Sequence, residues 1–381
     1  MIRITQVINN LQTGGAEMML LRLMERLDRD RFEPSVITMI GEGTVGPKLR
    51  ELDVPVVALG ASRRRISLGT LFGVRRHLRA LQPDVIQAWM YHSNLAAYLS
   101  RGAVKGKPAL AWNIRHSLHD LQHEGWLTRR VIMAGARRSR RVDAVISNSR
   151  VSLDQHESIG YRSPRNVVIP NGFDLSELGF SEEDRVASRR SMGMSEDSIL
   201  VGGIGRNHPM KDHESLVRMV RQLHDQGHDV HCVLAGRGLE PGGDAETLRQ
   251  VSGLGPRLHL MPEIDRVSGL LSALDVFVVS SRWGEGFPNV LAEAMACEVP
   301  CIATDVGDVR YILEDPDRIV PPGDVSAMTN AVGSLLERTP EERRSIGCLG
   351  RKRIEDNFQI EAITHQYQDL WSSLAESGGQ R

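Results

Sequence analysis

Two glutamates in one loop–helix segment are the residues of this sequence whose chemistry is easiest to define. Glu285 and Glu293 lie within the segment that runs from Ser280 to Ala296. An ionised carboxylate accepts hydrogen bonds more strongly than a neutral oxygen, so this pair suits the hydroxyl groups of a sugar. A helix that starts near Pro288 would add unpaired backbone amides, which attract phosphate. The segment predicts a site for a molecule with hydroxyls and phosphate, whereas the alternative is a strand–helix unit whose glutamates face water.

Two cations form a second candidate group. Arg206 and Lys211 follow Gly205 at the end of an apolar run that is typical of a strand. Arginine offers a fork of donors and lysine a point charge, so the two can hold a diphosphate and neutralise its charge as it leaves. The third spaced glycine of a dinucleotide fingerprint is missing after Gly205. The alternative interpretation is a pair of surface cations.

Glycines mark further strand ends. Gly14 and Gly15 lie between an expected strand and an expected helix, and Gly236 closes another expected strand. Glycine lets a backbone approach a ligand closely, and a helix start adds positive potential. Glycines at such turns are also ordinary turn chemistry.

Apolar runs and amphipathic segments alternate along the chain, which predicts an α/β fold with two successive doubly wound parallel sheets. Proline, asparagine and glycine between Ile169 and Asp174 predict the junction of the two halves. We expect strands at Arg3–Ile8, Pro34–Met39, Val54–Ala58, Val85–Gln87, Ala109–Ile114, Ala144–Ser147 and Asn166–Ile169, and then at Ile199–Ile204, His231–Leu234, Leu258–Leu260, Val276–Val279 and Pro300–Ala303.

The length of 381 residues is enough for two domains. We expect an N-terminal domain at 1–169, a C-terminal domain at 170–358 and a final helix at 359–376. Roughly 18 apolar residues would be needed for a spanning helix, and no such run occurs. The N-terminus has no signal-peptide core, and the four cysteines include no Cys-x-x-Cys pair. We therefore expect a cytoplasmic protein with reduced thiols.

Charge is divided unevenly along the chain. Residues 1–180 hold 26 Lys+Arg and 16 Asp+Glu, and the remainder holds 21 and 32, so the halves carry +10 and −11 and sum to −1. The densest basic cluster, between Arg129 and Arg141, surrounds an apolar patch and could lie on an anionic membrane surface, which would make the protein peripheral on the inner face. A solvated helix face is the alternative. We expect no nucleic-acid partner, because aromatic residues are not interleaved with the cations.

Metal-binding patterns are weak. Asp28 with Asp30, and Asp315 with Asp317, have Asp-x-Asp spacing, but neither pair follows a central strand. Arg206 and Lys211 can supply the positive charge that Mg²⁺ would otherwise provide. We expect neither a metal nor another cofactor.

The segment from Ser280 to Ala296 closely resembles the signature of the retaining family 4 glycosyltransferases, which have the GT-B fold. The resemblance is strongest from Pro170 to Asp308. It implies two Rossmann-like domains that face a cleft, with the acceptor on the first and the donor on the second, and a C-terminal helix that crosses back onto the first domain. It also implies retention of the anomeric configuration by a front-face route.

The resemblance assigns roles to residues of the second domain. It implies that Glu285 contacts the donor sugar, that Glu293 contacts the ribose, and that Arg206 and Lys211 bind the diphosphate. The other donor-binding residues that it implies here are Gly205, Gly236, Gly286, Phe287, Pro288, Asn289 and Val290.

In the first domain, the family's glycine-rich turn corresponds to Gly14 and Gly15, which would face the donor. Related enzymes commonly place a histidine near the donor sugar and the acceptor. His116 is the preferred match, and its competitors are Arg115, His119 and His92.

The predicted activity is transfer of a hexosyl-type sugar from a nucleotide diphosphate sugar, with UDP favoured over GDP. The acceptor would be a hydroxyl of a lipid-linked or polysaccharide glycan intermediate, and a soluble acceptor remains open. One alternative is a non-hydrolysing sugar-nucleotide epimerase, which would need acids and bases around C2 of the sugar. Another is a non-catalytic GT-B binding module.

Overall fold

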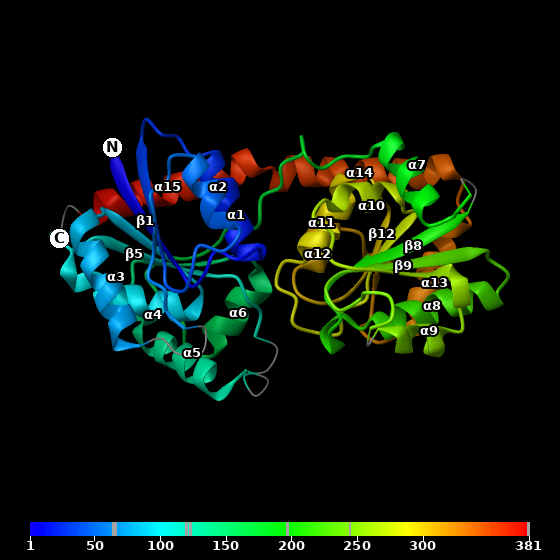
Figure 1. The fold of residues 1–381 in the computed structure, drawn as a ribbon, viewed down its shortest axis with the longest axis horizontal. Coiled ribbons are helices and arrows are strands. Elements are labelled where there is room, and N and C mark those ends of the chain that lie inside the picture. The colour runs from blue at the N-terminus through cyan, green and yellow to red at the C-terminus, as the bar shows by residue number, and fades with distance from the viewer. Residues whose placement is uncertain (63–66, 119–120, 122–123, 196–197, 244, 379–381) are drawn as a thin grey trace. The chain divides into compact units, whose positions relative to one another are not determined.

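The computed structural model is shown in Figure 1 and describes residues 1–62, 67–118, 121, 124–195, 198–243 and 245–378. The chain divides into two compact units. The first consists of Met1–Gly172 together with Ile360–Arg381, and the second is Phe173–Gln359. The change of unit at Gly172 and Phe173 falls inside the predicted junction.

The first unit is built on a parallel sheet. Its strands have the order β3-β2-β1-β4-β5-β6-β7, and every pair is parallel. They are β1 (Ile2–Ile8), β2 (Phe32–Thr38), β3 (Val56–Ala58), β4 (Val85–Trp89), β5 (Ala109–Ile114), β6 (Ala144–Ser147) and β7 (Asn166–Val168). Each coincides with a predicted strand to within two residues at either end, because near-continuous apolar runs are typical of parallel strands buried on both faces.

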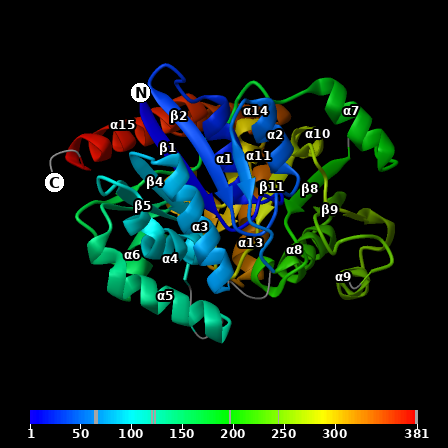
Figure 2. The same cartoon turned by 60° about the vertical axis from the view of Figure 1, so that its left-hand side comes forward.

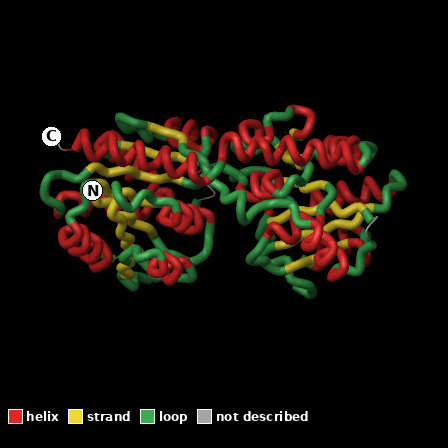
Figure 3. Tube along the Cα trace, turned by 90° about the horizontal axis from the view of Figure 1, so that it is seen from above, coloured by secondary structure: helices red, strands yellow, loops and turns green. Residues whose placement is uncertain are grey.

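Helices cover both faces of this sheet (Figures 2 and 3). One hydrophobic core joins the sheet to α1, α2 and α15, and the other joins it to α3, α4 and α5. The helices are α1 (Gly15–Glu25), α2 (Val45–Glu51), α3 (Leu68–Leu81), α4 (Met90–Ser100), α5 (Trp126–Arg138), α6 (Arg150–Ser158) and α15 (Ile360–Gly378). The first unit is therefore a doubly wound, Rossmann-like layer structure.

The last helix, α15, belongs to the first unit although it follows the second unit in the chain. Trp371 is fully buried, and its Nε1–H donates to Gln87 Oε1 at 2.8 Å. Tyr367 stacks on Trp89 and accepts a hydrogen bond from Asn113 Nδ2 at 2.9 Å. Buried aromatic side chains with satisfied polar atoms hold α15 against β4 and β5.

The second unit repeats the architecture. Its strands have the order β10-β9-β8-β11-β12-β13, and every pair is parallel. They are β8 (Ile199–Ile204), β9 (Val230–Ala235), β10 (Leu258–Met261), β11 (Val276–Val279), β12 (Cys301–Thr304) and β13 (Ile319–Val320). The edge strand β13 was not predicted, because two residues are too few to give a period.

Helices also form two layers in this unit. One core joins the sheet to α10, α11, α12 and α14, and the other joins it to α8, α9 and α13. The helices are α7 (Glu182–Ser191), α8 (His213–Asp225), α9 (Glu246–Ser252), α10 (Val267–Ala273), α11 (Asn289–Ala296), α12 (Val309–Leu313), α13 (Val325–Leu336) and α14 (Pro340–Phe358). Within the described ranges, no helix combines the length and the apolar character that crossing a membrane requires.

Each sheet has one point where its strand order reverses direction. In the first unit this point lies between β1 and β4, and in the second it lies between β8 and β11. Ligands of open parallel sheets bind outside the carboxyl ends of the strands at such a point. The loops that follow these four strands are therefore the places to look for a site.

Candidate active site

Lys211 and Glu285 meet beyond the carboxyl ends of β8 and β11. Lys211 Nζ lies 2.6 Å from Glu285 Oε1, and only 16% and 9% of the two side chains are exposed. Ser281 Oγ donates to the same carboxylate oxygen at 2.7 Å. Two residues that the sequence placed in separate motifs thus form one charge-paired group at the reversal point of the sheet.

The two loops that carry this pair are tied to each other. Ser280 Oγ donates to Lys211 O at 2.8 Å, and Arg282 N–H donates to Met210 O at 2.8 Å. Arg282 Nε also lies 2.6 Å from Asp212 Oδ2, beside the start of α8. These bonds join side chain to backbone and backbone to backbone, so the position of one loop determines that of the other.

Two of the predicted donor-site glycines have a packing reason. A Cβ on Gly205 would lie 3.1 Å from Lys211 Cε, and a Cβ on Gly236 would collide with Gly205 O. Gly205 therefore leaves room for the lysine side chain, and Gly236 lets the loop after β9 approach the loop after β8. Gly286 is held by its carbonyl, which accepts from Asp308 N–H at 2.9 Å.

Arg206 differs from Lys211 in its surroundings. Its side chain is exposed, and no acid pairs with it among the residues that the structure describes. His213, which sequence reasoning missed, donates from Nε2 to both Gly205 O and Arg206 O at 3.2 Å. Burial lowers the pKa of His213, so a neutral imidazole holds the backbone beneath Arg206.

The helix start predicted near Pro288 is present. Pro288 is the N-cap of α11, none of the described side chains caps the helix there, and Asn289 is its first residue. Val290 is partly buried and lines a small hollow with Lys211, His213 and Ser281, and Glu293 lies partly buried one turn further on.

Phe287, which the sequence predicts at the donor site, has its side chain in the core. Its ring is buried and lies 6.0 Å from the ring of Phe173 and 5.3 Å from that of Phe358. The ring is part of the hydrophobic core of the second unit.

The glycine turn of the first unit opens α1, as predicted. Gly14 is its N-cap and Gly15 its first residue. A Cβ on Gly14 would lie 2.6 Å from Glu17 Oε2, because this carboxyl folds back over its own helix start. Burial raises the pKa of Glu17.

His116 lies beyond the carboxyl end of β5. Its Nε2 is 2.7 Å from Glu124 Oε1, and 39% of its side chain is exposed. Its ring packs edge-on against Tyr91, and its carbonyl accepts from Ser152 Oγ at 2.6 Å. A partly exposed imidazole with a carboxylate partner is able to contact a ligand.

The competitors of His116 lie in different surroundings. Arg115 lies over the ring of Trp89, donates to Tyr367 Oη at 3.3 Å, and has its pKa lowered by burial. His92 is partly buried, which lowers its pKa. His119 lies outside the described residues.

Beneath His116 lies a buried histidine that the sequence did not single out. His156 donates from Nδ1 to Ser152 O at 2.6 Å, and its Nε2 accepts from Tyr91 Oη at 2.8 Å. Burial lowers the pKa of His156 to about 4. It is therefore neutral at pH 7 and positions Tyr91, against which His116 packs.

The two Asp-x-Asp sequences form turns. Asp28 Oδ1 accepts from Asp30 N–H at 3.1 Å, and Asp315 Oδ1 accepts from Asp317 N–H at 3.1 Å. In the part of the chain that the structure describes, no group of three or more His, Cys, Asp or Glu residues could hold a metal ion.

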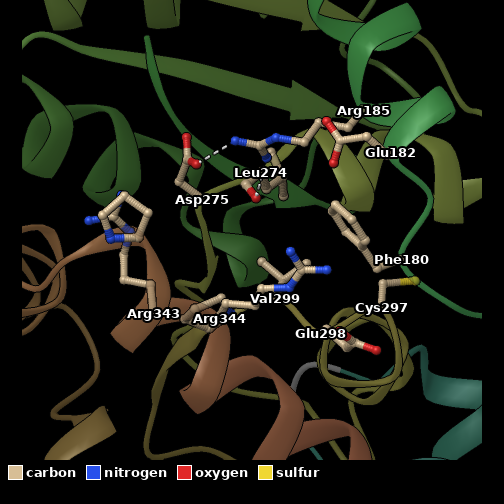
Figure 4. Close-up of a pocket in the computed structure, with 12 residues that line it drawn as sticks. Phe180, Glu182, Arg185, Leu274, Asp275, Cys297, Glu298, Val299, Arg343 and Arg344 are labelled. Carbon is tan, nitrogen blue, oxygen red and sulfur yellow. Dashed lines mark hydrogen bonds and ion pairs between the residues drawn. The ribbon is translucent and has the colours of Figure 1, made fainter. Parts of the chain in front are cut away.

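A separate pocket of about 180 Å³ lies at the amino ends of strands in the second sheet (Figure 4). Its lining includes Phe180, Arg344 and Asp275, and Asp275 pairs with Arg185 at 2.8 Å. Asp275 directly precedes β11, whereas Glu285 follows it. The pocket is therefore at the amino ends of the strands and is not part of the candidate site.

Comparison with known families gives two matches. The family described as Glycosyltransferase Family 4 matches residues 13–177, and the family described as Glycosyl transferases group 1 matches residues 198–338. The first match contains the glycine turn and His116, and the second contains Arg206, Lys211, Glu285 and Glu293.

Three individual proteins are also similar to this chain. A lipopolysaccharide core biosynthesis mannosyltransferase of Rhizobium meliloti (strain 1021) is 28% identical over 243 residues, which are 62% of this chain and 67% of that protein. A D-inositol 3-phosphate glycosyltransferase of Geodermatophilus obscurus is 32% identical over 210 residues, which are 51% and 46% of the two chains. The crystal structure of Anabaena Alr3699/HepE in complex with UDP and glucose has a TM-score of 0.82, 23% identity, and coverage of 98% of this chain and 100% of that one. That structure shares the two-domain GT-B fold.

The buried His156 predicts a pH dependence of stability. Its pKa is about 4 in the folded chain and 6.5 for a free side chain, so the unfolded chain binds the proton more tightly. Its contribution to stability is therefore fully present above pH 6.5 and falls by on the order of 3 kcal/mol as the pH drops towards 4. Chemical unfolding between pH 7 and 5 should show a steeper loss for the wild type than for His156→Gln. His365→Gln, at an exposed site of α15, is the control and should keep the wild-type slope; equal slopes in all three proteins would contradict the burial of a neutral His156.

Proposed function

The chain belongs to the group 1 and family 4 glycosyltransferases, and on that premise we propose that it transfers a hexosyl-type sugar from a nucleotide diphosphate sugar to an acceptor hydroxyl with retention of configuration. UDP is the favoured nucleotide. The donor would bind at the carboxyl edge of the second unit's sheet.

The Lys211–Glu285 pair is the observation that carries this proposal. Its lysine leaves two N–H groups for a diphosphate after one N–H has gone to Glu285, since an ammonium has three donors. Arg206 is exposed nearby in sequence and adds a fork of donors. A carboxylate for hydroxyls and cations for phosphates thus follow neighbouring strands β8 and β11.

We propose the following roles for the four charged residues. Arg206 and Lys211 bind the diphosphate and stabilise it as it leaves. Glu285 accepts from the sugar, and Glu293, further along α11, accepts from the ribose. The start of α11 would attract the negatively charged donor, because the amino terminus of a helix carries positive potential.

The proposed reaction needs little proton transfer by the protein. The bond between the anomeric carbon and the diphosphate oxygen breaks while the acceptor oxygen forms a new bond on the same face of the sugar. The leaving diphosphate takes the proton of the acceptor hydroxyl. Arg206 and Lys211 compensate its charge, so we propose that neither a metal nor another cofactor is required.

The acceptor that we propose is a lipid-linked or polysaccharide glycan intermediate, bound by the first unit near His116. The names of the relatives support this choice, since one acts in lipopolysaccharide core biosynthesis. His116 and Glu124 would contact hydroxyl groups, because imidazole nitrogens and carboxylate oxygens form hydrogen bonds with them.

A peripheral location on the inner face of an anionic membrane completes the proposal. Helix α5 carries a groove lined by Arg129, Arg130 and Arg137 together with Met133 and Ala134. At its start, Trp126 is 65% exposed, and Arg130 lies over its ring. An exposed tryptophan among arginines suits the boundary between lipid headgroups and acyl chains.

A screen of nucleotide sugars for turnover tests the proposed function directly. Release of the nucleotide diphosphate, with an acceptor or by slow hydrolysis, would support it. Epimerised donor without any transfer would support the epimerase alternative. Tight binding of donor without any turnover would support a binding module.

Removal of either cation should reduce turnover. Arg206→Ala and Lys211→Ala are each expected to lower it by on the order of 10²-fold, because a preorganised charge-stabilising donor is lost. Turnover of the productive donor, with thermal unfolding as the test of folding, is the measurement. Arg237→Ala, an exposed cation after β9, is the control and should retain more activity. Near-normal rates in both variants, or loss of wild-type activity in excess EDTA, would contradict this mechanism.

Glu285 and Glu293 should have separable functions. Glu293→Gln should weaken binding of the free nucleotide diphosphate, because a charged acceptor becomes a neutral one of the same shape. Glu285→Gln should leave that affinity nearly unchanged, because the amide oxygen can still accept from Lys211 Nζ and Ser281 Oγ and so keep the lysine in place, and it should depress transfer and sugar discrimination. Calorimetry with the free diphosphate and turnover of the donor measure the two effects. The assignment is wrong if Glu285→Gln loses as much nucleotide affinity as Glu293→Gln.

Liposome sedimentation tests the membrane surface. The protein should bind anionic vesicles more than neutral ones, and added salt should weaken the binding, because exposed charges are screened. The double variant Arg129→Gln and Arg137→Gln should bind less, and so should a variant that lacks Arg138, Arg140 and Arg141. The control is the double variant Arg190→Gln and Arg338→Gln. It removes two charges from the second unit, as many as the first double variant removes, and it should not reduce binding. Equal binding to neutral and anionic vesicles would reject the membrane surface.

A further inference from the structure

The carboxylate of Glu285 is held asymmetrically. Its Oε1 receives two hydrogen bonds, from Lys211 Nζ at 2.6 Å and from Ser281 Oγ at 2.7 Å. Within the described residues, Oε2 has no hydrogen-bond partner. It is also not completely buried, so solvent or a ligand can reach it. One oxygen is thus saturated by the protein, and the other is left accessible.

Burial and a fixed backbone restrict the hydroxyl of Ser281 to partners within the protein. It is 1% exposed, and its carbonyl accepts from Thr304 Oγ1 at 2.6 Å, which fixes its backbone to β12. Gly284 has a φ of 77°, a conformation that strains other residues. The loop turns back there, and the side chains of Ser281 and Glu285 meet.

The neighbouring serine shows that the two hydroxyls have different tasks. Ser280 donates to a backbone oxygen, Lys211 O, and so ties the two loops together. Ser281 donates to the carboxylate itself. A hydrogen bond to a charged group is stronger than one between neutral groups, so this contact restrains the rotation of the carboxylate.

We propose that Ser281 is a positioning residue that, together with Lys211, fixes Glu285 so that Oε2 alone is presented to the donor sugar. A single fixed acceptor recognises the position of a sugar hydroxyl, whereas a rotating carboxylate would accept from hydroxyls in several positions. Ser281 would thereby set the discrimination between sugars that differ in the configuration at one carbon. This inference rests on the proposed function, because it assumes that Glu285 contacts the sugar.

Kinetics of Ser281→Ala with the productive donor and with its epimer test the proposal. Discrimination between the two donors, measured as the ratio of kcat/KM values, should fall on the order of 10-fold, the effect expected from losing one hydrogen bond to a charged group. Affinity for the free nucleotide diphosphate should stay within about twofold, since nothing that binds the phosphates has changed. Ser281→Thr, which keeps the hydroxyl, should restore discrimination.

Matched controls separate positioning from a merely structural role. Ser272→Ala removes a hydroxyl that is equally buried. Ser272 lies near the end of α10, before the amino end of β11, and its loss should leave discrimination unchanged. Thermal unfolding shows whether each variant is folded. A folded Ser281→Ala with wild-type discrimination would overturn the inference, as would an equal loss in Ser272→Ala. A wild type that turns over no nucleotide sugar would instead refute the proposed function.

Discussion

The ion pair between Lys211 and Glu285 is the interaction on which the rest of the site depends. Both side chains are largely withdrawn from solvent, and their charged atoms are 2.6 Å apart. Removing two charges from water is costly, and loss of one partner leaves the other charge uncompensated. The hydrogen bond from a serine hydroxyl to the carboxylate and the loop-to-loop hydrogen bonds around the lysine offset this cost. Such an arrangement favours a charge distribution that is fixed before a substrate arrives.

Topology explains why this pair can exist at all. In the order β10-β9-β8-β11-β12-β13, the strands β8 and β11 are neighbours although a long stretch of chain separates them. Their carboxyl ends therefore place Lys211 beside Glu285. The first unit has the corresponding arrangement, in which β1 and β4 are neighbours and β5 carries His116 at its end. One architecture thus places a lysine–glutamate pair beyond the carboxyl ends of the strands in one unit and a histidine–glutamate pair beyond those in the other.

Much of the fold could be predicted from the sequence, because parallel strands are long apolar runs and their helices are amphipathic. The short β13 gave no such signal. Local sequence also identified Lys211 and Glu285, but it could not show that they are paired, since contacts between distant segments depend on strand order. Ser281, His213 and His156 were missed because buried polar residues look ordinary until their partners are known. For His213, the sequence did offer a signal, because this histidine directly follows the Lys211–Asp212 turn. The sequence did not show that the ring of Phe287 packs in the core, because a motif does not reveal which of its side chains face inward.

A crystal structure with a bound nucleotide diphosphate sugar would test the central claim most directly. We predict that the diphosphate lies within hydrogen-bond distance of Arg206 and Lys211, that Glu285 Oε1 keeps both of its partners, and that Oε2 accepts from a sugar hydroxyl. A donor bound elsewhere would contradict it, for example in the pocket at the amino ends of β11 and β12. A donor that separates Lys211 from Glu285 would also contradict it, because the pair would then be a resting contact and not the fixed part of the site.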